Sequence, residues 1–365
     1  MIEVLIEGMT SNKGGKETYI VNMFDALDKT KYRFTFVAYD DEIAYESYLV
    51  KQGAKVVHVT ARSKGVFRHK RELNKLFTEQ SFDVVWAHKT TLSACEILEI
   101  AKKRAVPVRI IHSHSSANMG GRFTYMMHTI NKRRIFKLAN AYLACSETAS
   151  KWFFGDREVD IARNGINLDK FKYSEEVRNN LRQKLHLEDA FVIGHVGRFG
   201  IEKNHKKLIN VFSEYIKKNP NAKLLLCGDG EERANIEAQI DELGLKNDVI
   251  LAGVVSNVHE YLQVMDVIVM PSLFEGLPFS LLEAQAAGLK CVVSDTVSDE
   301  SNVLGRNKFI PLDATDLLWA TSILAQDFDY DRSDSYHQMA EAGYDVAKSA
   351  ADIDEKINLW LSQSK

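Results

Sequence analysis

The chain has 365 residues, of which 45% are hydrophobic, and its 47 Lys and Arg against 50 Asp and Glu give a net charge of −3 at pH 7. This length exceeds what one hydrophobic core usually supports, so we expect about two domains, while a pI of about 6.4 and basic clusters without interleaved aromatics argue against nucleic-acid binding. No apolar run approaches the roughly 18 residues of a transmembrane helix, and the N-terminus enters a strand instead of a signal peptide, so we expect a cytoplasmic protein.

Strand-like apolar segments alternate with helical patterns along the chain. The first series comprises residues 3–6, 34–38, 55–59, 84–87, 108–112 and 141–145. The second series comprises residues 191–196, 223–227, 249–251, 267–270 and 291–294, with Phe309 as a weaker sixth member. This alternation predicts an α/β protein with two doubly wound, Rossmann-like units. The polar stretch of residues 171–189 between the two series is the predicted linker.

Two features of the first series are candidate ligand contacts. Gly14 and Gly15 follow the first strand, where glycine lets a backbone approach a diphosphate or an acceptor, although a plain turn would have the same pattern. His112 and His114 end the fifth strand and, being two residues apart, face the same way. Structural histidines remain the alternative here, and His88, which closes the preceding strand, is a weaker candidate.

The net charge differs between the two halves of the chain. Residues 1–180 carry 29 Lys and Arg against 21 Asp and Glu, or +8, whereas the remaining residues sum to −11. Basic clusters of this kind can hold a protein to the anionic inner face of the cell membrane, at about 1 kcal/mol for each basic side chain near the surface. Runs of charge are also common on solvated surfaces, so both interpretations stay open. The clusters are residues 62–64, 68–71, 102–104 and 132–134.

Arg198 and Lys203 follow the first strand of the second series. Ligands of open α/β sheets gather beyond the carboxyl ends of the strands. A guanidinium and an ammonium group there could stabilise the negative charge that a departing diphosphate gains in the transition state. The alternative is an ordinary pair of surface cations.

The segment 266–288 predicts a buried strand, a turn and a helix in that order. Residues 266–270 form the apolar run, Gly276 permits a sharp turn, Pro278 suits the first position of a helix, and Gly288 suits its end.

The start of that helix would be a site for phosphate. Free backbone N–H groups of Phe279, Ser280 and Leu281 would lie at the positive end of the helix. With a diphosphate bound there, Glu275 in the turn could accept hydrogen bonds from sugar hydroxyls, and Glu283 in the helix could accept them from ribose hydroxyls. The segment therefore predicts a nucleotide-sugar site.

These segments resemble the motifs of the retaining glycosyltransferases of family 4. Glu275 and Glu283, separated by seven residues, resemble the family's E-x7-E motif, and residues 275–288 are especially similar to bacterial enzymes that build exopolysaccharide or capsule repeat units. The other matching segments are Gly14-Gly15 (glycine loop), residues 163–167 (N-G-I-D turn), residues 196–199 (G-R) and residues 202–205 (K-N).

The resemblance implies the GT-B fold, in which two doubly wound Rossmann-like domains face each other across a cleft. The implied domains are residues 1–170 on the acceptor side and residues 190–345 on the nucleotide-sugar side, with residues 346–365 as a helix that returns to the first domain. Gly228 would lie beside the donor. The family has a histidine near the reacting sugar, and the pattern favours His114 over His112 without deciding between them.

The implied function is transfer of a hexosyl unit from a UDP-sugar to a hydroxyl of a glycan, carried on a polyprenyl diphosphate, with retention of configuration. The expected catalytic residues are Arg198, Lys203, Glu275 and His114. The expected substrate-binding residues are Gly14, Gly15, His112, Gly228, Phe279, Ser280, Leu281 and Glu283.

No metal or other cofactor is expected. The acidic residues Asp327, Asp329 and Asp331 follow a helical pattern instead of a strand, and as a calcium loop they lack the required glycine and glutamate, so we interpret them as a solvated loop. Two other functions remain open. One is a nucleotide-sugar hydrolase or epimerase of the same fold, which would release UDP without an acceptor. The other is a non-catalytic nucleotide-sugar-binding partner of another transferase.

Overall fold

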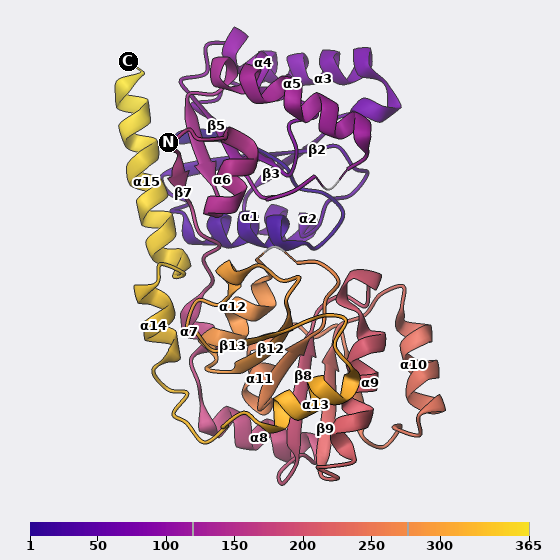
Figure 1. Ribbon diagram of the computed structural model, residues 1–365. Coiled ribbons are helices and arrows are strands. Elements are labelled where there is room, and N and C mark those ends of the chain that lie inside the picture. Colours follow the sequence, from indigo (N-terminus) through magenta and orange to yellow (C-terminus); the bar gives the residue numbers. More distant parts are fainter. Residues whose placement is uncertain (119, 276, 365) are drawn as a thin grey trace. The chain divides into compact units, whose positions relative to one another are not determined.

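The computed structural model describes residues 1–118, 120–275 and 277–364 (Figure 1). The chain forms two compact units, one made of Met1–Gly165 with Asp345–Lys365 and the other of Ile166–Tyr344. It therefore passes between the units twice, after Gly165 and after Tyr344. Each unit holds one parallel sheet, which confirms the predicted α/β class with two Rossmann-like sheets.

The first unit is built on a seven-stranded parallel sheet in the order β3-β2-β1-β4-β5-β6-β7. Its interior strands are almost wholly apolar and buried, as expected for a sheet covered by helices on both faces. The strands are β1 (Ile2–Glu7), β2 (Tyr32–Ala38), β3 (Lys55–His58), β4 (Val84–Lys89), β5 (Val108–Ser113), β6 (Ala141–Ala144) and β7 (Asp160–Ile161).

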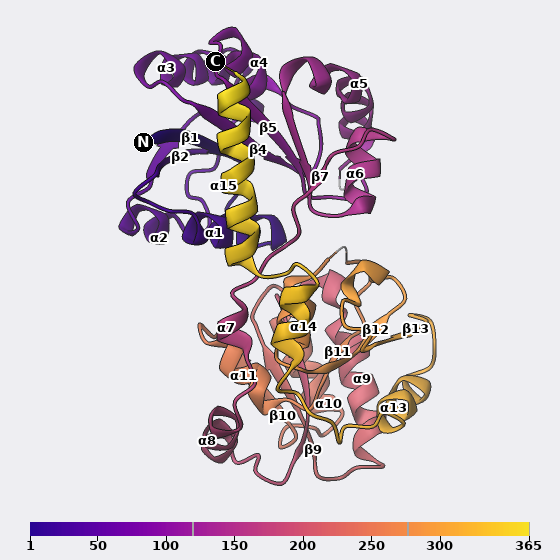
Figure 2. The ribbon, with the colours of Figure 1, turned by 90° about the vertical axis from the view of Figure 1, so that its left-hand side faces the viewer.

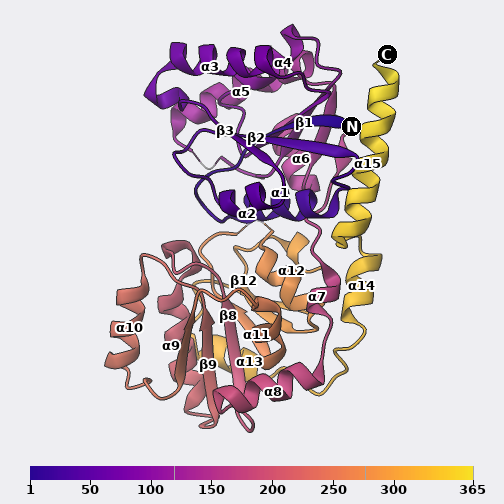
Figure 3. The same cartoon turned by 180° about the vertical axis from the view of Figure 1, so that it is seen from behind.

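Helices cover both faces of this sheet (Figures 1 and 3). One face is covered by α1 (Gly15–Ala26) and α2 (Glu46–Lys51). The other face packs against α3 (Val66–Glu79), α4 (Glu96–Lys103), α5 (Arg122–Leu138) and α6 (Glu147–Phe154), whose apolar residues form one core with the strands.

The last helix, α15 (Val346–Gln363), belongs to the first unit and runs along it in Figure 2. It packs on α1 and β5 and buries Ile353 and Ile357. Asp354 fixes it in place by binding Lys31 Nζ at 2.6 Å and the Tyr32 hydroxyl at 2.6 Å. At its start, a Cβ on Gly165 would lie 2.8 Å from the Val346 Cα, so glycine permits this close packing.

The second unit has a six-stranded parallel sheet in the order β10-β9-β8-β11-β12-β13. The strands are β8 (Phe191–Val196), β9 (Ala222–Cys227), β10 (Val249–Gly253), β11 (Val267–Met270), β12 (Lys290–Ser294) and β13 (Asn307–Ile310). One face packs against α9 (His205–Ile216), α10 (Arg233–Glu242) and α13 (Asp316–Leu324). The remaining helices are α7 (Leu168–Phe171), α8 (Glu175–Leu185), α11 (Val258–Val264), α12 (Phe279–Ala286) and α14 (Ser335–Glu341).

The segment 171–189, which we predicted as a linker, lies inside the second unit. Its helix α8 packs on α11, and two of its arginines have structural partners. Arg178 and Arg182 both bind the Asp266 carboxylate just before β11, the second at 3.2 Å, and Asp266 in turn accepts a hydrogen bond from the Val192 N–H at 2.7 Å. The composition suggested a solvated segment, but these charges are mostly buried against one another.

Each sheet reverses its strand order once, between β1 and β4 in the first unit and between β8 and β11 in the second. Ligands of open α/β sheets bind beyond the carboxyl ends of the strands at such a switch point. Gly14 follows β1, Lys203 follows β8, and Glu275 follows β11. The fold therefore places these three predicted site residues at the switch points of their sheets, while the predicted residues His112, His114 and Gly228 lie at the ends of neighbouring strands.

Candidate active site

Lys203 and Glu275 form a mostly buried ion pair in the second unit. Their side chains are 14% and 16% exposed, and the Lys203 ammonium contacts Glu275 Oε1. The two residues follow β8 and β11, which pair at Val267 and Ile268. The structure thus brings together two of the residues that the sequence predicts to be catalytic. Because the pair is poorly hydrated, removing one partner would leave an uncompensated charge.

Backbone contacts hold the two loops of this pair side by side. The Leu273 N–H donates to Glu202 O at 2.8 Å, and the Asn204 side-chain amide donates to Pro271 O at 3.0 Å. Asn204 has a left-handed backbone with φ of 54°, and its side chain does not cap α9. These two hydrogen bonds hold the loop that carries Glu275 against the loop that carries Lys203.

Glycines allow the ends of β8 and β9 to approach each other. Gly228 has φ of +151°, and a Cβ there would lie 1.9 Å from Gly197 O. A Cβ on Gly197 would lie 3.2 Å from Lys203 Cε. The Gly228 N–H already donates to Gly253 O at 2.8 Å, so the structure gives this predicted substrate-binding glycine a packing role.

Arg198 lies apart from the buried pair, on the surface. Its side chain is 58% exposed and binds Glu231 Oε2 through Nη2 at 2.8 Å and through Nε at 3.1 Å. Exposed ion pairs of this kind contribute only about 0–1 kcal/mol. A phosphate could therefore take the place of Glu231 on the guanidinium at little energetic loss.

Helix α12 begins at Phe279, with Pro278 as its N-cap residue, so the predicted start is one residue too early. The Leu281 N–H donates to Pro278 O at 3.1 Å and is not free, contrary to our prediction. Among the described residues, no acceptor binds the N–H groups of Phe279 and Ser280, so two of the three predicted donors remain open to a ligand. The predicted turn at Gly276 lies outside the described residues.

The end of α12 matches the sequence prediction. Gly288 has φ of +77°, its N–H donates to Gln285 O at 2.9 Å, and the Leu289 N–H donates to Ala284 O at 2.9 Å. These two hydrogen bonds, together with a left-handed glycine, form a Schellman motif.

Glu283 is partly buried in α12 and, within the described part of the chain, no cation or hydrogen-bond donor contacts its carboxyl group. Burial raises the pKa of Glu283 to about 7. A carboxyl group that burial holds near half-ionisation at neutral pH, next to an open helix start, is typical of a ligand contact.

In the first unit, His88, His112 and His114 form a cluster at the ends of β4 and β5. His88 Nδ1 and His114 Nε2 are 2.9 Å apart, and the rings of His112 and His114 lie 4.2 Å apart. Burial lowers the pKa of all three, to about 3 for His112, so they are neutral imidazoles at physiological pH. His112 is fully buried, and of the two predicted histidines His114 is the one that reaches the surface.

Gly14 and Gly15 start helix α1. Gly14 is the N-cap residue, with an ordinary φ of −96°, and α1 begins at Gly15. Two residues further on, Glu17 binds the Thr10 hydroxyl at 2.8 Å and Lys16 Nζ at 3.2 Å. The buried Glu17 carboxylate therefore joins the first turn of α1 to Thr10 in the loop after β1.

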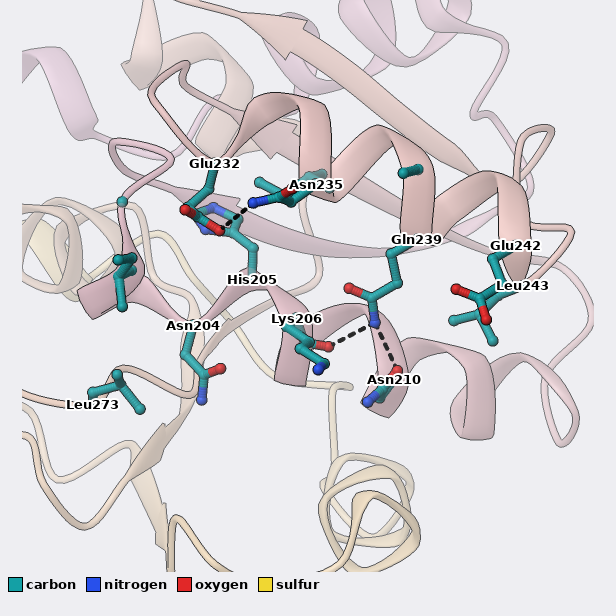
Figure 4. Close-up of a pocket in the computed structure, with 14 residues that line it drawn as sticks. Asn204, His205, Lys206, Asn210, Glu232, Asn235, Gln239, Glu242, Leu243 and Leu273 are labelled. Atoms are coloured by element: carbon teal, nitrogen blue, oxygen red, sulfur yellow. Dashed lines mark hydrogen bonds between the residues drawn. The ribbon is translucent and has the colours of Figure 1, made fainter.

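A separate pocket of about 680 Å³ lies between α9 and α10 (Figure 4). Its wall includes amide side chains, of which Gln239 donates to Asn210 Oδ1 at 2.7 Å and Asn235 donates to Glu232 at 3.0 Å. Of the described residues, Gly200 and Leu273 connect it to the loops of the buried pair, but Lys203, Glu275 and Glu283 do not line it. It is therefore distinct from the predicted phosphate site.

Comparisons with known proteins agree with this arrangement. A model described as Glycosyltransferase Family 4 matches residues 13–170, and one described as Glycosyl transferases group 1 matches residues 177–345. EpsF of Bacillus subtilis, which its name assigns to the glycosyltransferases, is 31% identical over 332 residues, covering 87% of this chain and 85% of that protein. The chain belongs to glycosyltransferase family 4.

Solved structures show the same fold as this family 4 glycosyltransferase. Anabaena HepE superposes with a TM-score of 0.79 at 19% identity, covering 98% of this chain and 100% of that one. The GT-B fold predicted from the motifs is thereby confirmed. An Escherichia coli protein named UDP-Gal:alpha-D-GlcNAc-diphosphoundecaprenol alpha-1,3-galactosyltransferase is 31% identical over 157 residues, or 40% of this chain and 36% of that protein. Within the described residues, no helix is both long and apolar enough to cross a membrane.

Sequence reasoning about the glycosyltransferase missed two kinds of residue. Glu231, the partner of Arg198, lies in a loop whose path the motifs do not specify. His88 was ranked low, yet it contacts His114 directly, and Tyr19 packs on all three histidine rings. The structure also shows why Gly8 is a glycine, because a Cβ there would lie 2.6 Å from His88 O.

Proposed function

We propose that this glycosyltransferase moves a hexosyl unit from a UDP-sugar to a hydroxyl of a lipid-linked glycan in bacterial surface polysaccharide synthesis, with retention of configuration. The observation that carries the proposal is the constellation in the second unit: the Lys203–Glu275 pair, the open N–H groups of Phe279 and Ser280, and the unpaired Glu283. Its cations and N–H groups fit a diphosphate, and its carboxyl groups fit sugar hydroxyls.

The names of similar proteins support the choice of substrates. Solved structures of HepE are described as complexes with UDP and with UDP-glucose. The Escherichia coli relative is named for UDP-galactose as donor and a diphosphoundecaprenol-linked sugar as acceptor. A UDP-sugar and a polyprenyl-diphosphate-linked glycan are therefore the first substrates to test.

The charges of the site favour a reaction without a dedicated protein base. Glu275 is held by Lys203, and the conjugate acids of the histidines have pKa values well below neutrality because they are buried. Neither group would take up a proton readily at pH 7. In the proposed reaction the acceptor hydroxyl attacks from the side of the leaving UDP, and a diphosphate oxygen takes its proton while Lys203 and Arg198 stabilise the growing charge.

The same charges could replace a metal ion. Lys203, Arg198 and the start of α12 together supply the positive potential that a divalent cation provides at other phosphate-transfer sites. We therefore expect turnover to survive EDTA. Complete inhibition by EDTA that Mn²⁺ reverses would contradict this assignment.

A surface of the first unit could hold the enzyme at its lipid-linked acceptor. On α5, Phe123, Met126 and Ile130 recur at helical spacing and are 69%, 48% and 51% exposed, and on α3 Phe67 is 91% exposed. Basic clusters flank these residues on the same two helices. Apolar side chains beside cations are typical of a protein face that binds an anionic membrane.

Product analysis tests the proposal. The purified chain would be incubated with single UDP-sugars and a polyprenyl-diphosphate-linked acceptor, and the product linkage would be read by NMR. We expect acceptor-dependent UDP release and an axial glycosidic bond from an axial donor. UDP release that ignores the acceptor would favour a hydrolase. UDP-sugar binding without any turnover would favour the non-catalytic partner.

A further inference from the structure

The histidine cluster of the first unit has the ligand spacing of a metal site. One ring nitrogen each from His88, His112 and His114 lies within 4.8 Å of the others. The three side chains come from the ends of two adjacent strands, β4 and β5, whose residues His88 and His112 pair directly. His88 and His112 are strand residues, and His114 follows β5 directly, where its N–H donates to Lys89 O at 2.8 Å, so backbone pairing supports all three positions.

Several polar atoms of the cluster are buried without a protein partner. Both ring nitrogens of His112 and the hydroxyl of Tyr19 have none among the described residues. Tyr19 packs edge-on against His112, with ring centroids 4.8 Å apart. Leaving such groups unsatisfied costs about 1–3 kcal/mol each, so a ligand that satisfies them would stabilise this region.

We propose that His88, His112 and His114 bind one divalent transition-metal ion of the zinc class, and that this binding inhibits the transferase. Imidazole suits zinc and its neighbours, whereas magnesium and calcium prefer oxygen ligands. Three imidazoles leave a fourth tetrahedral position, which the Tyr19 hydroxyl or a water molecule can fill.

Three features set the strength of the site. Tetrahedral zinc with bonds of about 2.0–2.1 Å holds its nitrogen ligands about 3.4 Å from one another. His88 Nδ1 and His114 Nε2, now 2.9 Å apart, would have to separate slightly, whereas ring nitrogens near the 4.8 Å limit would have to approach by about 1.4 Å. The ion would also take the place of the proton between His88 Nδ1 and His114 Nε2, with that proton moving to the outer nitrogen of its own ring. Lys16 opposes a dication here, but Glu17 contacts its ammonium at 3.2 Å and offsets part of the charge. We expect reversible binding that is weaker than in a structural zinc site.

Inhibition would follow because His114 is the cluster member that reaches the surface. An imidazole nitrogen bound to zinc cannot also contact a donor sugar. This part of the inference rests on the proposed function. Zinc binding itself does not, so it can be measured on the chain without any turnover.

The test is titration of the full chain, stripped with EDTA and dialysed, with Co²⁺ as a spectroscopic substitute for Zn²⁺. We expect one Co²⁺ per chain, with the visible absorption of tetrahedral cobalt, displaced by Zn²⁺. His88→Gln and His112→Gln should each lose this spectrum. His69→Gln should keep it, because His69 is also buried in the first unit but binds Thr60 O at 2.8 Å, away from the cluster.

Wild-type protein that gives no tetrahedral spectrum would overturn the proposal, and so would a spectrum that persists in both cluster variants. If one variant fails to fold, as judged by circular dichroism, the wild-type spectrum and the other variant still decide. In an activity assay, Zn²⁺ should inhibit the wild type and inhibit His88→Gln at least tenfold less strongly. Zinc binding without inhibition would retain the site and reject its inhibitory role.

Discussion

The two units share the strand order around their switch points, and each has a buried ion pair there, but they differ in what lies beside it. In the first unit the pair is Glu7 and Lys89, at the ends of β1 and β4. Beside that pair, the ends of β4 and β5 carry a cluster of neutral imidazoles, of which His88 and His112 are buried and His114 is partly exposed. In the second unit, β8 and β11 lead into the charged pair Lys203–Glu275, with the Arg198–Glu231 pair on the adjacent surface. Fixed charges and open N–H groups suit a diphosphate, whereas neutral imidazoles suit the hydroxyls of a sugar or an acceptor. Repetition of a fold therefore does not imply repetition of a ligand.

The largest expected effect is loss of the buried cation of the second unit. Lys203→Ala leaves Glu275 buried without its partner and removes a phosphate contact. We expect the loss to be about 3–5 kcal/mol, which lowers kcat/KM by about 100- to 5,000-fold. Steady-state kinetics would measure this. Lys207→Ala is the matched control, because Lys207 lies on α9 and binds Asp316 at 2.8 Å, away from the pair. Equal losses in both variants would remove Lys203 from the site.

A smaller loss is expected at the exposed cation. Arg198→Ala should raise the activation free energy by about 3 kcal/mol and so lower kcat roughly a hundredfold, because the guanidinium stabilises charge that develops on the diphosphate. Its pair with Glu231 is exposed, so the melting temperature should hardly change. Arg233→Ala, which breaks similar exposed pairs with Asp229 and Glu237, should leave both quantities near wild type. A wild-type kcat in Arg198→Ala would contradict the transition-state role.

Glu283 should contribute to the affinity for the nucleotide, and its contribution should depend on pH. Because charge-assisted hydrogen bonds contribute about 1.5–3 kcal/mol, Glu283→Ala should weaken UDP binding roughly 10- to 100-fold while Glu275→Ala mainly slows transfer. With a Glu283 pKa of about 7, wild-type affinity for UDP should rise from pH 6 to pH 8. Glu283→Gln corrects for the titration of UDP itself in the same calorimetric series. Equal pH dependence in both proteins would contradict the ribose contact.

The raised pKa of Glu283 also has a consequence for stability without ligand. Its value in the folded chain lies above the ordinary 4.5, so the stability that Glu283 contributes is full below about 4.5 and is lost as pH rises through about 7. Glu283→Gln should therefore lose less stability than the wild type between pH 5 and pH 8, as measured by urea unfolding.

The smallest effects are expected on the surface of the first unit that we propose binds the membrane. Lys70→Gln and Arg71→Gln should each weaken binding to anionic vesicles by about 1 kcal/mol, more visibly at low salt. Phe67→Ser should weaken it at any salt concentration. Exchanging Lys217 and Lys218 of the second unit for Gln should have no effect in the same co-sedimentation assay. Vesicle binding that ignores all changes in α3 would reject this surface.

The fold could be predicted from the sequence because parallel strands covered on both faces are nearly continuous apolar runs. Every predicted strand is present, and β7 was missed because it has only two residues. The linker prediction failed because Arg178 and Arg182 look solvated in a sequence, while in the structure they bind the partly buried Asp266. Composition reports how polar a residue is but not which partner it finds.

The candidate site was predicted less completely. Motif spacing identified Lys203 and Glu275 but could not show that they bind each other, since their contact depends on β8 and β11 being neighbours. It also could not show that Leu281 uses its N–H within α12. The neutral state of the histidines depends on burial by Tyr19 and by the strand ends, which only the packed structure shows.

The central claim is that the second unit, through Lys203, Glu275, Glu283 and the start of α12, binds the nucleotide. It is tested most directly by calorimetric titration of UDP in EDTA. The account predicts that Lys203→Ala and Glu283→Ala weaken UDP binding at least tenfold, while His88→Gln and His112→Gln leave it within twofold of wild type. UDP binding that survives both changes in the second unit, or that is lost equally in the histidine variants, would contradict it.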